Sequence, residues 1–382
     1  MEVQFIKVNP TVRPVFDEEV GRVPFELTGV LPVAVGARGD ADGPPSWERL
    51  HSPLAAKSSL TTLNWSLAKE HGDLDAAKTL ARSLDIELTL HAPYYVDFFG
   101  SEEARTRSLR QLEWACVIAE SLGARLVVTH LGFYGPGSRA DSTAELASTL
   151  GNVARWLRQY SRGSLRLGIE PSGHPDVFGS REEVLELARR ARLVPVLNVP
   201  HLAARERRPF DTVAEIRPIV DEFVAASAGP LYAHFSGVEM NGPNEFRLTP
   251  IKRGAIRFDP LADVLAEREY DVTVISSSPL LEHDAMYMKL LYERALARRW
   301  ARLHPTPPPS GRPGARATVP TARPKAPALR KQPRPPRARP HAPARRPARL
   351  PRRTGQPRPT RRSPPSRRDR SARRESHGAK RR

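Results

Sequence analysis

The sequence predicts an α/β fold of the (β/α)8 barrel type, followed by a disordered basic tail. Short apolar runs typical of buried parallel strands alternate along the chain with segments of helical periodicity. This alternating part covers roughly 300 residues, which is ample for one large domain with its own core. The composition then changes abruptly. We therefore expect a barrel over residues 1–303 and a Pro/Arg-rich tail over residues 304–382.

The clearest strand candidates share one pattern, an apolar run that ends on His, Glu, Asn or Ser. These runs cover residues 88–91, 126–130, 165–170, 194–198, 231–234 and 272–277. Two weaker candidates, residues 2–8 and 31–36, bring the count to eight, which is the number that a closed barrel needs.

Segments of helical periodicity lie between and after these runs. They cover residues 67–84, 101–122, 140–160, 180–192, 212–226, 260–268 and 282–299. Ser180 and Glu183 have the spacing of a capping box, which places a helix start at Ser180. Residues 38–58 are rich in Gly, Pro, Asp and Ser and are expected to form a loop.

The formal net charge of +19 is concentrated at one end of the chain. Residues 304–382 contain 25 Lys and Arg against 2 Asp and Glu, so they carry +23 and the preceding residues carry −4. Nineteen of the 39 prolines lie in the same segment. Such a tail has little to bury and is expected to be disordered. It either neutralises nucleic-acid phosphates without reading sequence, or it is a passive extension.

The single cysteine, Cys116, lies in a helical segment, so neither an intrachain disulfide nor a Cys-based zinc site is expected. A buried thiol in a reducing compartment is the simplest interpretation. No apolar run approaches the length of a membrane span, and the first residues do not resemble a signal peptide. The sequence therefore predicts a cytoplasmic protein without membrane contact.

The residues at the strand ends predict a metal site. His91, His130, Glu170 and His234 each end an apolar run, and His201 follows Asn198 closely enough to share the same pocket. In a β/α barrel the C-terminal strand ends converge on one face, where active sites lie. A carboxylate such as Glu170 is costly to bury without a cation or strong hydrogen bonds. Imidazole and carboxylate ligands suit zinc, and also manganese or iron.

Several short motifs resemble endonuclease IV of the archaeal type, within the xylose-isomerase-like TIM barrels. They are His91-Ala-Pro-Tyr-Tyr, Val-Thr-His130-Leu-Gly-Phe-Tyr-Gly, Ile-Glu170 followed by Phe178-Gly-Ser-Arg-Glu-Glu, His234-Phe-Ser-Gly, and Val274-Ile-Ser-Ser-Ser-Pro279 with Glu282-His-Asp-Ala-Met286. The resemblance covers residues 1–300 in consistent order, and Met1-Glu-Val-Gln-Phe is similar to the second strand of that family. The usual first strand is missing or replaced, so an atypical or truncated first strand is expected.

The resemblance implies an enzyme that hydrolyses the DNA backbone at abasic sites during base excision repair, with divalent metal ions, zinc foremost. It implies that His91, His130 and Glu170 hold the first ion. Glu170 would bridge to a second ion, where His234 binds. His201 would hold a third ion. Glu170 and Asn198 stand at the predicted catalytic positions.

Three positions depart from the family pattern. Asn198 stands where the family has Asp, Ser277 stands where it has Glu, and Arg247 stands where it has His. None of the three can replace an anionic or imidazole ligand. We therefore expect one or two ions, with the third site lost. Glu282 and Asp284 are candidates to stand in for the missing carboxylate of Ser277.

Two residues are candidates for substrate contact. Tyr94 follows a strand end and could wedge into DNA or stack on a sugar. Arg247 could place a guanidinium where the charge of the third ion would lie and clamp a phosphate. Two other functions fit the same barrel: a sugar or sugar-phosphate isomerase or epimerase with one divalent ion, and a non-catalytic DNA-binding descendant of the nuclease.

Overall fold

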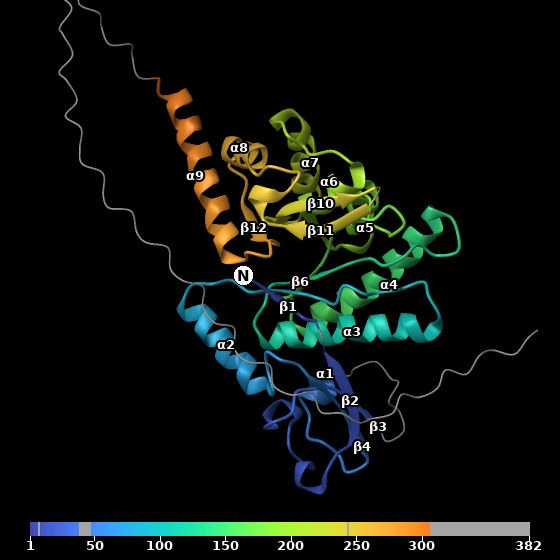
Figure 1. Cartoon of the computed structure of the whole chain (residues 1–382). Helices are drawn as coiled ribbons and strands as arrows, with labels where there is room; N and C mark the ends of the chain where they lie inside the picture. Colours follow the sequence, from blue (N-terminus) through green and yellow to red (C-terminus); the bar gives the residue numbers. More distant parts are fainter. Residues whose placement is uncertain (7, 38–46, 243, 306–382) are drawn as a thin grey trace, which may run out of the picture. The chain divides into compact units, whose positions relative to one another are not determined.

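The computed structural model describes residues 1–6, 8–37, 47–242 and 244–305 of the chain (Figure 1). The tail predicted for residues 304–382 lies outside the described residues from residue 306 onward, and its disorder stays a prediction. Within the described residues, no helix combines the length and the apolar composition that crossing a bilayer requires.

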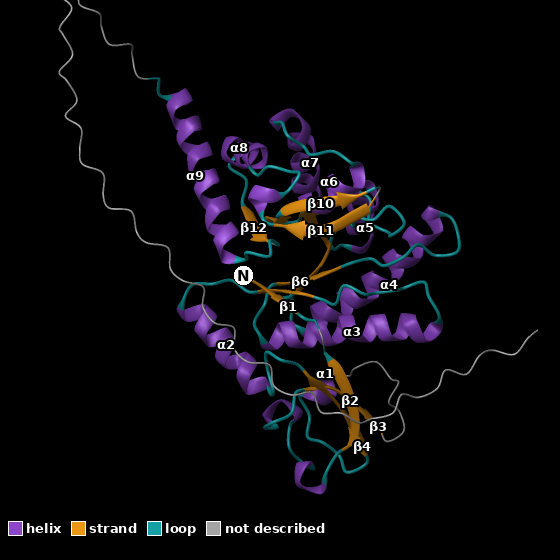
Figure 2. Ribbon diagram, viewed as in Figure 1, coloured by secondary structure: helices purple, strands orange, loops and turns teal. Residues whose placement is uncertain are grey.

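The centre of the fold is a nearly closed parallel sheet of seven strands (Figure 2). All six clear strand candidates belong to it, and the weak candidate at residues 2–8 supplies the remaining strand. In sheet order the strands are β1 (Glu2–Gln4), β5 (Thr89–His91), β6 (Leu126–Thr129), β7 (Arg166–Ile169), β8 (Val194–Asn198), β9 (Leu231–Phe235) and β12 (Val272–Ser276). Each neighbouring pair is parallel.

The prediction of eight barrel strands is wrong, because residues 31–36 lie in a different sheet. They form β3 (Pro32–Ala37), which pairs antiparallel with β4 (Ser58–Asn64), and β4 pairs antiparallel with β2 (Asn9–Pro14). The helix described between β3 and β4 is the four-residue α1 (Trp47–Leu50). Figure 1 shows this small sheet across helix α3 (Glu102–Ser121) from the barrel strands.

The predicted helices are confirmed with small shifts at their ends. Besides α3 they are α2 (His71–Ser83), α4 (Arg139–Tyr160), α5 (Arg181–Ala191), α7 (Val213–Ala226), α8 (Asp259–Arg268) and α9 (Glu282–Leu303). Ser180 caps α5, and the capping box with Glu183 is present. Cys116 is buried in α3, and this burial raises the pKa of its thiol.

The sequence did not predict two elements that border the site. Helix α6 (Val199–Glu206) begins immediately after β8, and Asn198 is its N-cap. Because no loop separates the strand from the helix, the sequence shows no separate helical segment at this position. Strands β10 (Gly237–Asn241) and β11 (Asn244–Thr249) form an antiparallel hairpin after β9.

Alternate residues along the strands face either the helices or the barrel interior. The interior is filled by a small apolar cluster that is separate from the main core between sheet and helices. Its members are Leu126, Val128, Val194, Val196 and Tyr232, with Ile275 packed against them. This packed interior leaves the C-terminal ends of the strands as the open face of the barrel.

Candidate metal centre

The predicted site residues gather at the C-terminal ends of the barrel strands, where they line one open cavity of about 1070 Å³. His91 ends β5, and His130 and Glu170 directly follow β6 and β7. Asn198 ends β8, and His234 lies in β9. Because these five strands are parallel neighbours, their ends meet on one face, and the structure brings these residues together around one cavity.

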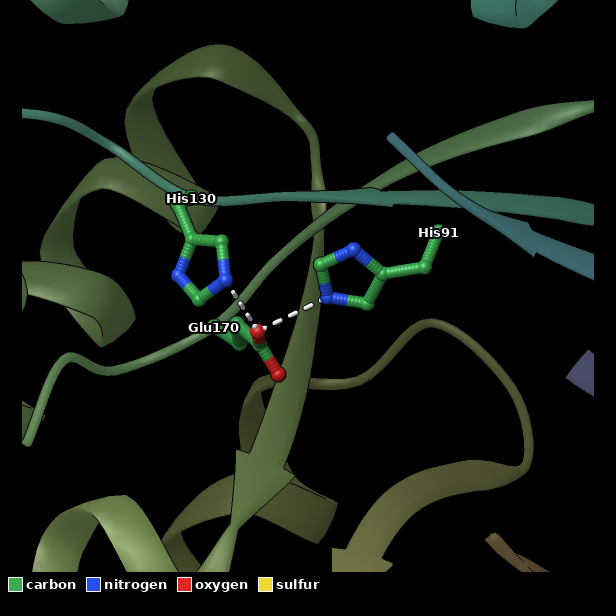
Figure 3. Close-up of side chains that lie close together, drawn as sticks. All are labelled: His91, His130 and Glu170. Atoms are coloured by element: carbon green, nitrogen blue, oxygen red, sulfur yellow. Dashed lines mark hydrogen bonds and ion pairs between the residues drawn. The ribbon is translucent and has the colours of Figure 1, made fainter. Parts of the chain in front are cut away.

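Glu170 lies between two imidazoles in Figure 3. Its Oε1 is 2.9 Å from Nε2 of His91 and 3.3 Å from Nε2 of His130. Its side chain is only 1% exposed. One potential ligand atom from each residue lies within 4.8 Å of the other two, so a single ion could contact all three.

The hydrogen bonds of the two histidines fit a metal ion. Nδ1 of His91 contacts the carbonyl oxygen of Ala92 at 2.8 Å, which fixes Nδ1 as a donor and directs Nε2 at Glu170. Nε2 of His130 is buried and has no hydrogen-bond partner among the described residues. Burial lowers the pKa of His130 to about 3, so the ring is neutral and one of its two nitrogens keeps an unshared electron pair. A neutral imidazole aimed at a carboxylate is the arrangement that a bound cation would complete.

The charge of Glu170 is strongly stabilised despite its burial. Burial alone would raise the pKa of this carboxyl, but the three imidazoles around it outweigh that effect and hold its pKa well below the ordinary value. Glu170 is therefore a permanent anion at the centre of the cluster.

The second carboxylate oxygen of Glu170, Oε2, contacts Asn198 and His234, whereas Oε1 contacts His91 and His130. Oε2 accepts a hydrogen bond from Nδ2 of Asn198 at 2.9 Å and lies 2.8 Å from Nδ1 of His234. Burial alone would lower the pKa of His234, but the carboxylates of Glu2 and Glu170 raise it to about 10.

Glu2 belongs to the site, although the sequence pattern did not single it out. Its Oε2 lies 3.0 Å from Nε2 of His234 and accepts a hydrogen bond from Tyr232 at 3.1 Å. The neighbouring Gln4 donates to its other oxygen. The available signal was the alternation Glu-Val-Gln in β1, which places two polar side chains on one face of a strand.

His201 pairs with Glu245 and not with the His91 cluster. Its Nδ1 contacts Oε2 of Glu245, while its Nε2 remains 4.0 Å from Oε1 of Glu170. Burial opposes both charges, but their mutual attraction lowers the pKa of Glu245 and raises the pKa of His201. Glu245 therefore lies beside His201, and both residues line the cavity.

Arg247 does not line the cavity, so the idea that its guanidinium takes the place of a third ion is wrong. Its side chain is 64% exposed, and Nε donates to Glu239 across the hairpin at 2.7 Å. A register shift between Glu239 and Met240 displaces the pairing in this hairpin. This local irregularity separates Arg247 from Glu245, which faces the site.

Ser277 lines the cavity, but no acidic residue of α9 replaces its missing carboxylate. Asp284 is buried and accepts hydrogen bonds from Ser278 and from the backbone of Ile251. Glu282 is exposed at the start of the helix. Neither lines the cavity, so the expectation that one of them substitutes for Ser277 is wrong.

Aromatic side chains border the opening of the cavity. Tyr94 donates to Oε1 of Gln4 at 2.6 Å, and its ring lies 5.0 Å from that of His91. Burial raises its pKa to about 12, so the hydroxyl stays protonated. Tyr95 is 94% exposed, and Phe133 is also exposed. These rings could contact a bound substrate.

Gly132 allows the loop after His130 to lie close to the loop after His91. Its φ is +79°, and an added Cβ would lie 2.6 Å from the carbonyl oxygen of Val96. Any larger residue would therefore push the two loops apart and move His130 away from Glu170.

Comparison with known proteins identifies one family. Residues 56–283 match the xylose isomerase-like TIM barrel family. An uncharacterized protein of Methanocaldococcus jannaschii is 26% identical over 215 residues, which cover 54% of this chain and 77% of that protein.

Two solved structures are similar to this chain at low sequence identity. A D-tagatose 3-epimerase-like protein is 19% identical, with a TM-score of 0.48 over 61% of this chain and 85% of its own. Endonuclease IV from Thermus thermophilus is 18% identical, with a TM-score of 0.46 over 68% of this chain and 87% of its own.

Proposed function

Because the chain belongs to the xylose isomerase-like TIM barrel family, whose members are mostly enzymes, we propose that it is a metal-dependent phosphodiesterase that cleaves DNA at abasic sites. The observation that carries this proposal is the cluster of His91, His130 and Glu170, whose potential ligand atoms all lie within 4.8 Å of one another. Two histidines and one glutamate, with a fourth position left open, form the ligand set of several hydrolytic zinc sites.

Each residue of the cluster has a distinct part in this reaction. His91, His130 and Glu170 would hold the ion, which supplies Lewis-acid activation of the phosphodiester when bound. Asn198 keeps Glu170 in place through its hydrogen bond to Oε2. The pair His201–Glu245 lines the same cavity and could exchange a proton with the attacking water or the leaving oxygen.

The surroundings of the cluster suit a nucleic acid. The cavity is wide and open, and Arg107 lines it together with Tyr94 and Phe133. A guanidinium can bind a phosphate, and aromatic rings can stack on bases or fill the gap left by a missing base. The +23 charge of residues 304–382 would add attraction to the DNA backbone that does not depend on sequence.

The test is strand cleavage of a duplex that carries one abasic site, by the full chain with Zn²⁺ or Mn²⁺. Glu170→Gln should reduce the rate about a thousandfold, which corresponds to about 4 kcal/mol of transition-state stabilisation. Chelation should have the same effect. Glu87→Gln removes an exposed carboxylate outside the cavity and serves as the matched control.

Cleavage that survives in folded Glu170→Gln would contradict the proposal. Interconversion of a ketose or ketose phosphate by the same protein, without cleavage, would instead identify a sugar isomerase or epimerase. Tight DNA binding without either reaction would identify a non-catalytic DNA-binding protein.

A further inference from the structure

His234 differs from the other histidines beside Glu170 because both of its ring nitrogens face carboxylates. Nδ1 lies 2.8 Å from Oε2 of Glu170, and Nε2 lies 3.0 Å from Oε2 of Glu2. An imidazole that ligates a metal must direct the unshared electron pair of one nitrogen at the ion. In His91 one nitrogen contacts a backbone carbonyl and the other contacts Glu170, whereas in His234 both nitrogens lie within 3.0 Å of a carboxylate oxygen.

Asn198 closes the gap between the Glu170 carboxylate and the His234 ring. Its Nδ2 lies 2.9 Å from Oε2 of Glu170 and 3.4 Å from Nδ1 of His234. Its Oδ1 accepts a hydrogen bond from the backbone N–H of His201, which fixes the orientation of the amide. An amide nitrogen donates hydrogen bonds and does not ligate cations. It therefore occupies the space in which a second ion would contact both residues.

The two oxygens of Glu170 have separate partners as a result. Oε1 faces His91 and His130, where an ion can bind. Oε2 is occupied by Asn198 and His234. A carboxylate divided in this way can contact one ion but is not free to bridge two.

Glu2 is held firmly enough to keep His234 in this position. The side chains of Glu2 and His234 are 4% and 2% exposed. Gln4 and Tyr232 each donate a hydrogen bond to the Glu2 carboxylate, at 3.1 Å in both cases. His234 is the third partner of this buried carboxylate, and losing the contact would leave the charge of Glu2 less compensated.

We propose that Glu2, acting through His234 and together with Asn198, fills the position of a second divalent ion and limits the centre to one ion. The ion binds at His91, His130 and Glu170, and Glu2 is a positioning residue. This inference rests on the metal centre of the proposed function but is independent of its substrate.

Metal stoichiometry tests this inference, measured by isothermal titration of the full chain with Zn²⁺ and by the content of tightly bound metal. The wild type should bind one equivalent, and Glu170→Gln should bind none. Asn198→Asp should still bind one, because Glu2 continues to hold His234. The double variant Glu2→Gln/Asn198→Asp releases His234 and adds a carboxylate, so it should bind two.

The matched control is Glu87→Gln/Asn198→Asp, which should bind one equivalent because Glu87 lies outside the cavity. Two equivalents in the wild type or in Asn198→Asp would overturn the inference. One equivalent in a folded Glu2→Gln/Asn198→Asp would also overturn it. If the double variant Glu2→Gln/Asn198→Asp shows no cooperative unfolding transition, it is not folded. The metal stoichiometries of the wild type and of Asn198→Asp then test the inference. A chain that binds one ion without cleaving abasic DNA overturns the proposed function and supports this inference.

Discussion

Nε2 of His234 lies 3.0 Å from Oε2 of Glu2, although 232 residues separate the two along the chain. The contact joins β1 to β9, and both residues line the cavity. Removing one partner of a buried ion pair leaves the other uncompensated, which is more costly than the pair itself is stabilising.

We therefore expect Glu2→Gln to lower the free energy of unfolding by about 3 kcal/mol at pH 7. Urea denaturation followed by circular dichroism measures this change. The exposed Glu87→Gln should stay within about 0.5 kcal/mol of the wild type. Equal stability of the two variants would mean that the Glu2–His234 pair contributes nothing.

Metal removal should destabilise the protein through the cluster around Glu170. An ion that binds only the folded state adds about 2.7 kcal/mol when its free concentration is a hundred times Kd. Chelation of the metal-loaded protein should therefore lower Tm, and added Zn²⁺ should restore it. This response should be absent in His91→Ala and unchanged in Trp300→Ala, an exposed residue of α9. A metal-dependent Tm in His91→Ala would place the ion elsewhere.

Tyr94 is expected to contribute to the binding of abasic DNA. Loss of one stacking ring costs about 1–3 kcal/mol, so Tyr94→Ala should weaken affinity by about 5- to 150-fold. Tyr94→Phe keeps the ring and loses only the hydrogen bond to Gln4, so it should retain most of the affinity. Fluorescence anisotropy with a labelled duplex in chelator separates binding from cleavage. Equal losses in both variants would assign the effect to the hydroxyl and not to stacking.

His71 should make stability depend on pH below neutrality. Burial lowers its pKa from 6.5 to about 4, and the ring stays bonded to Ser121 and the carbonyl of Pro32. The unfolded chain takes up a proton near pH 6.5, whereas the folded chain resists until about pH 4. Stability is therefore unaffected by this group above pH 6.5 and falls by about 3 kcal/mol as the pH drops toward 4.

Urea denaturation at pH 7 and pH 4 measures this dependence. His71→Gln cannot take up the proton, so its stability should fall less over the same range than that of the wild type. Identical losses in the two proteins would show that other groups cause the pH dependence.

The grouping of His91, His130, Glu170 and His234 could be predicted because each one ends its own apolar run. Strand order and parallel direction then bring these ends together without further information. The helices named in the sequence analysis could also be predicted from their periodicity, with only small shifts at their ends. This part of the fold depends on local patterns that repeat along the chain.

The errors lie where the outcome depends on pairing between distant segments. Residues 31–36 have the pattern of a barrel strand, but their partner β4 comes from the same N-terminal region. Glu2 lies in a three-residue strand whose alternation places it beside Gln4, but its role depends on the distant His234. The exclusion of Arg247 from the site follows from a register shift in the β10–β11 hairpin. None of these contacts leaves a periodic signal in the sequence.

The spacing of His91, His130 and Glu170 has a consequence for the timing of assembly. Each residue ends a different strand of the consecutive series β5, β6 and β7, so the cluster exists only after these three units have docked. A chain emerging from the ribosome therefore cannot capture its ion before Glu170 has been synthesised and placed. In small zinc modules the ion drives folding from the start. In this barrel an ion would bind only after the units of β5, β6 and β7 have assembled. Ion binding would therefore be a late step of folding and would not initiate it.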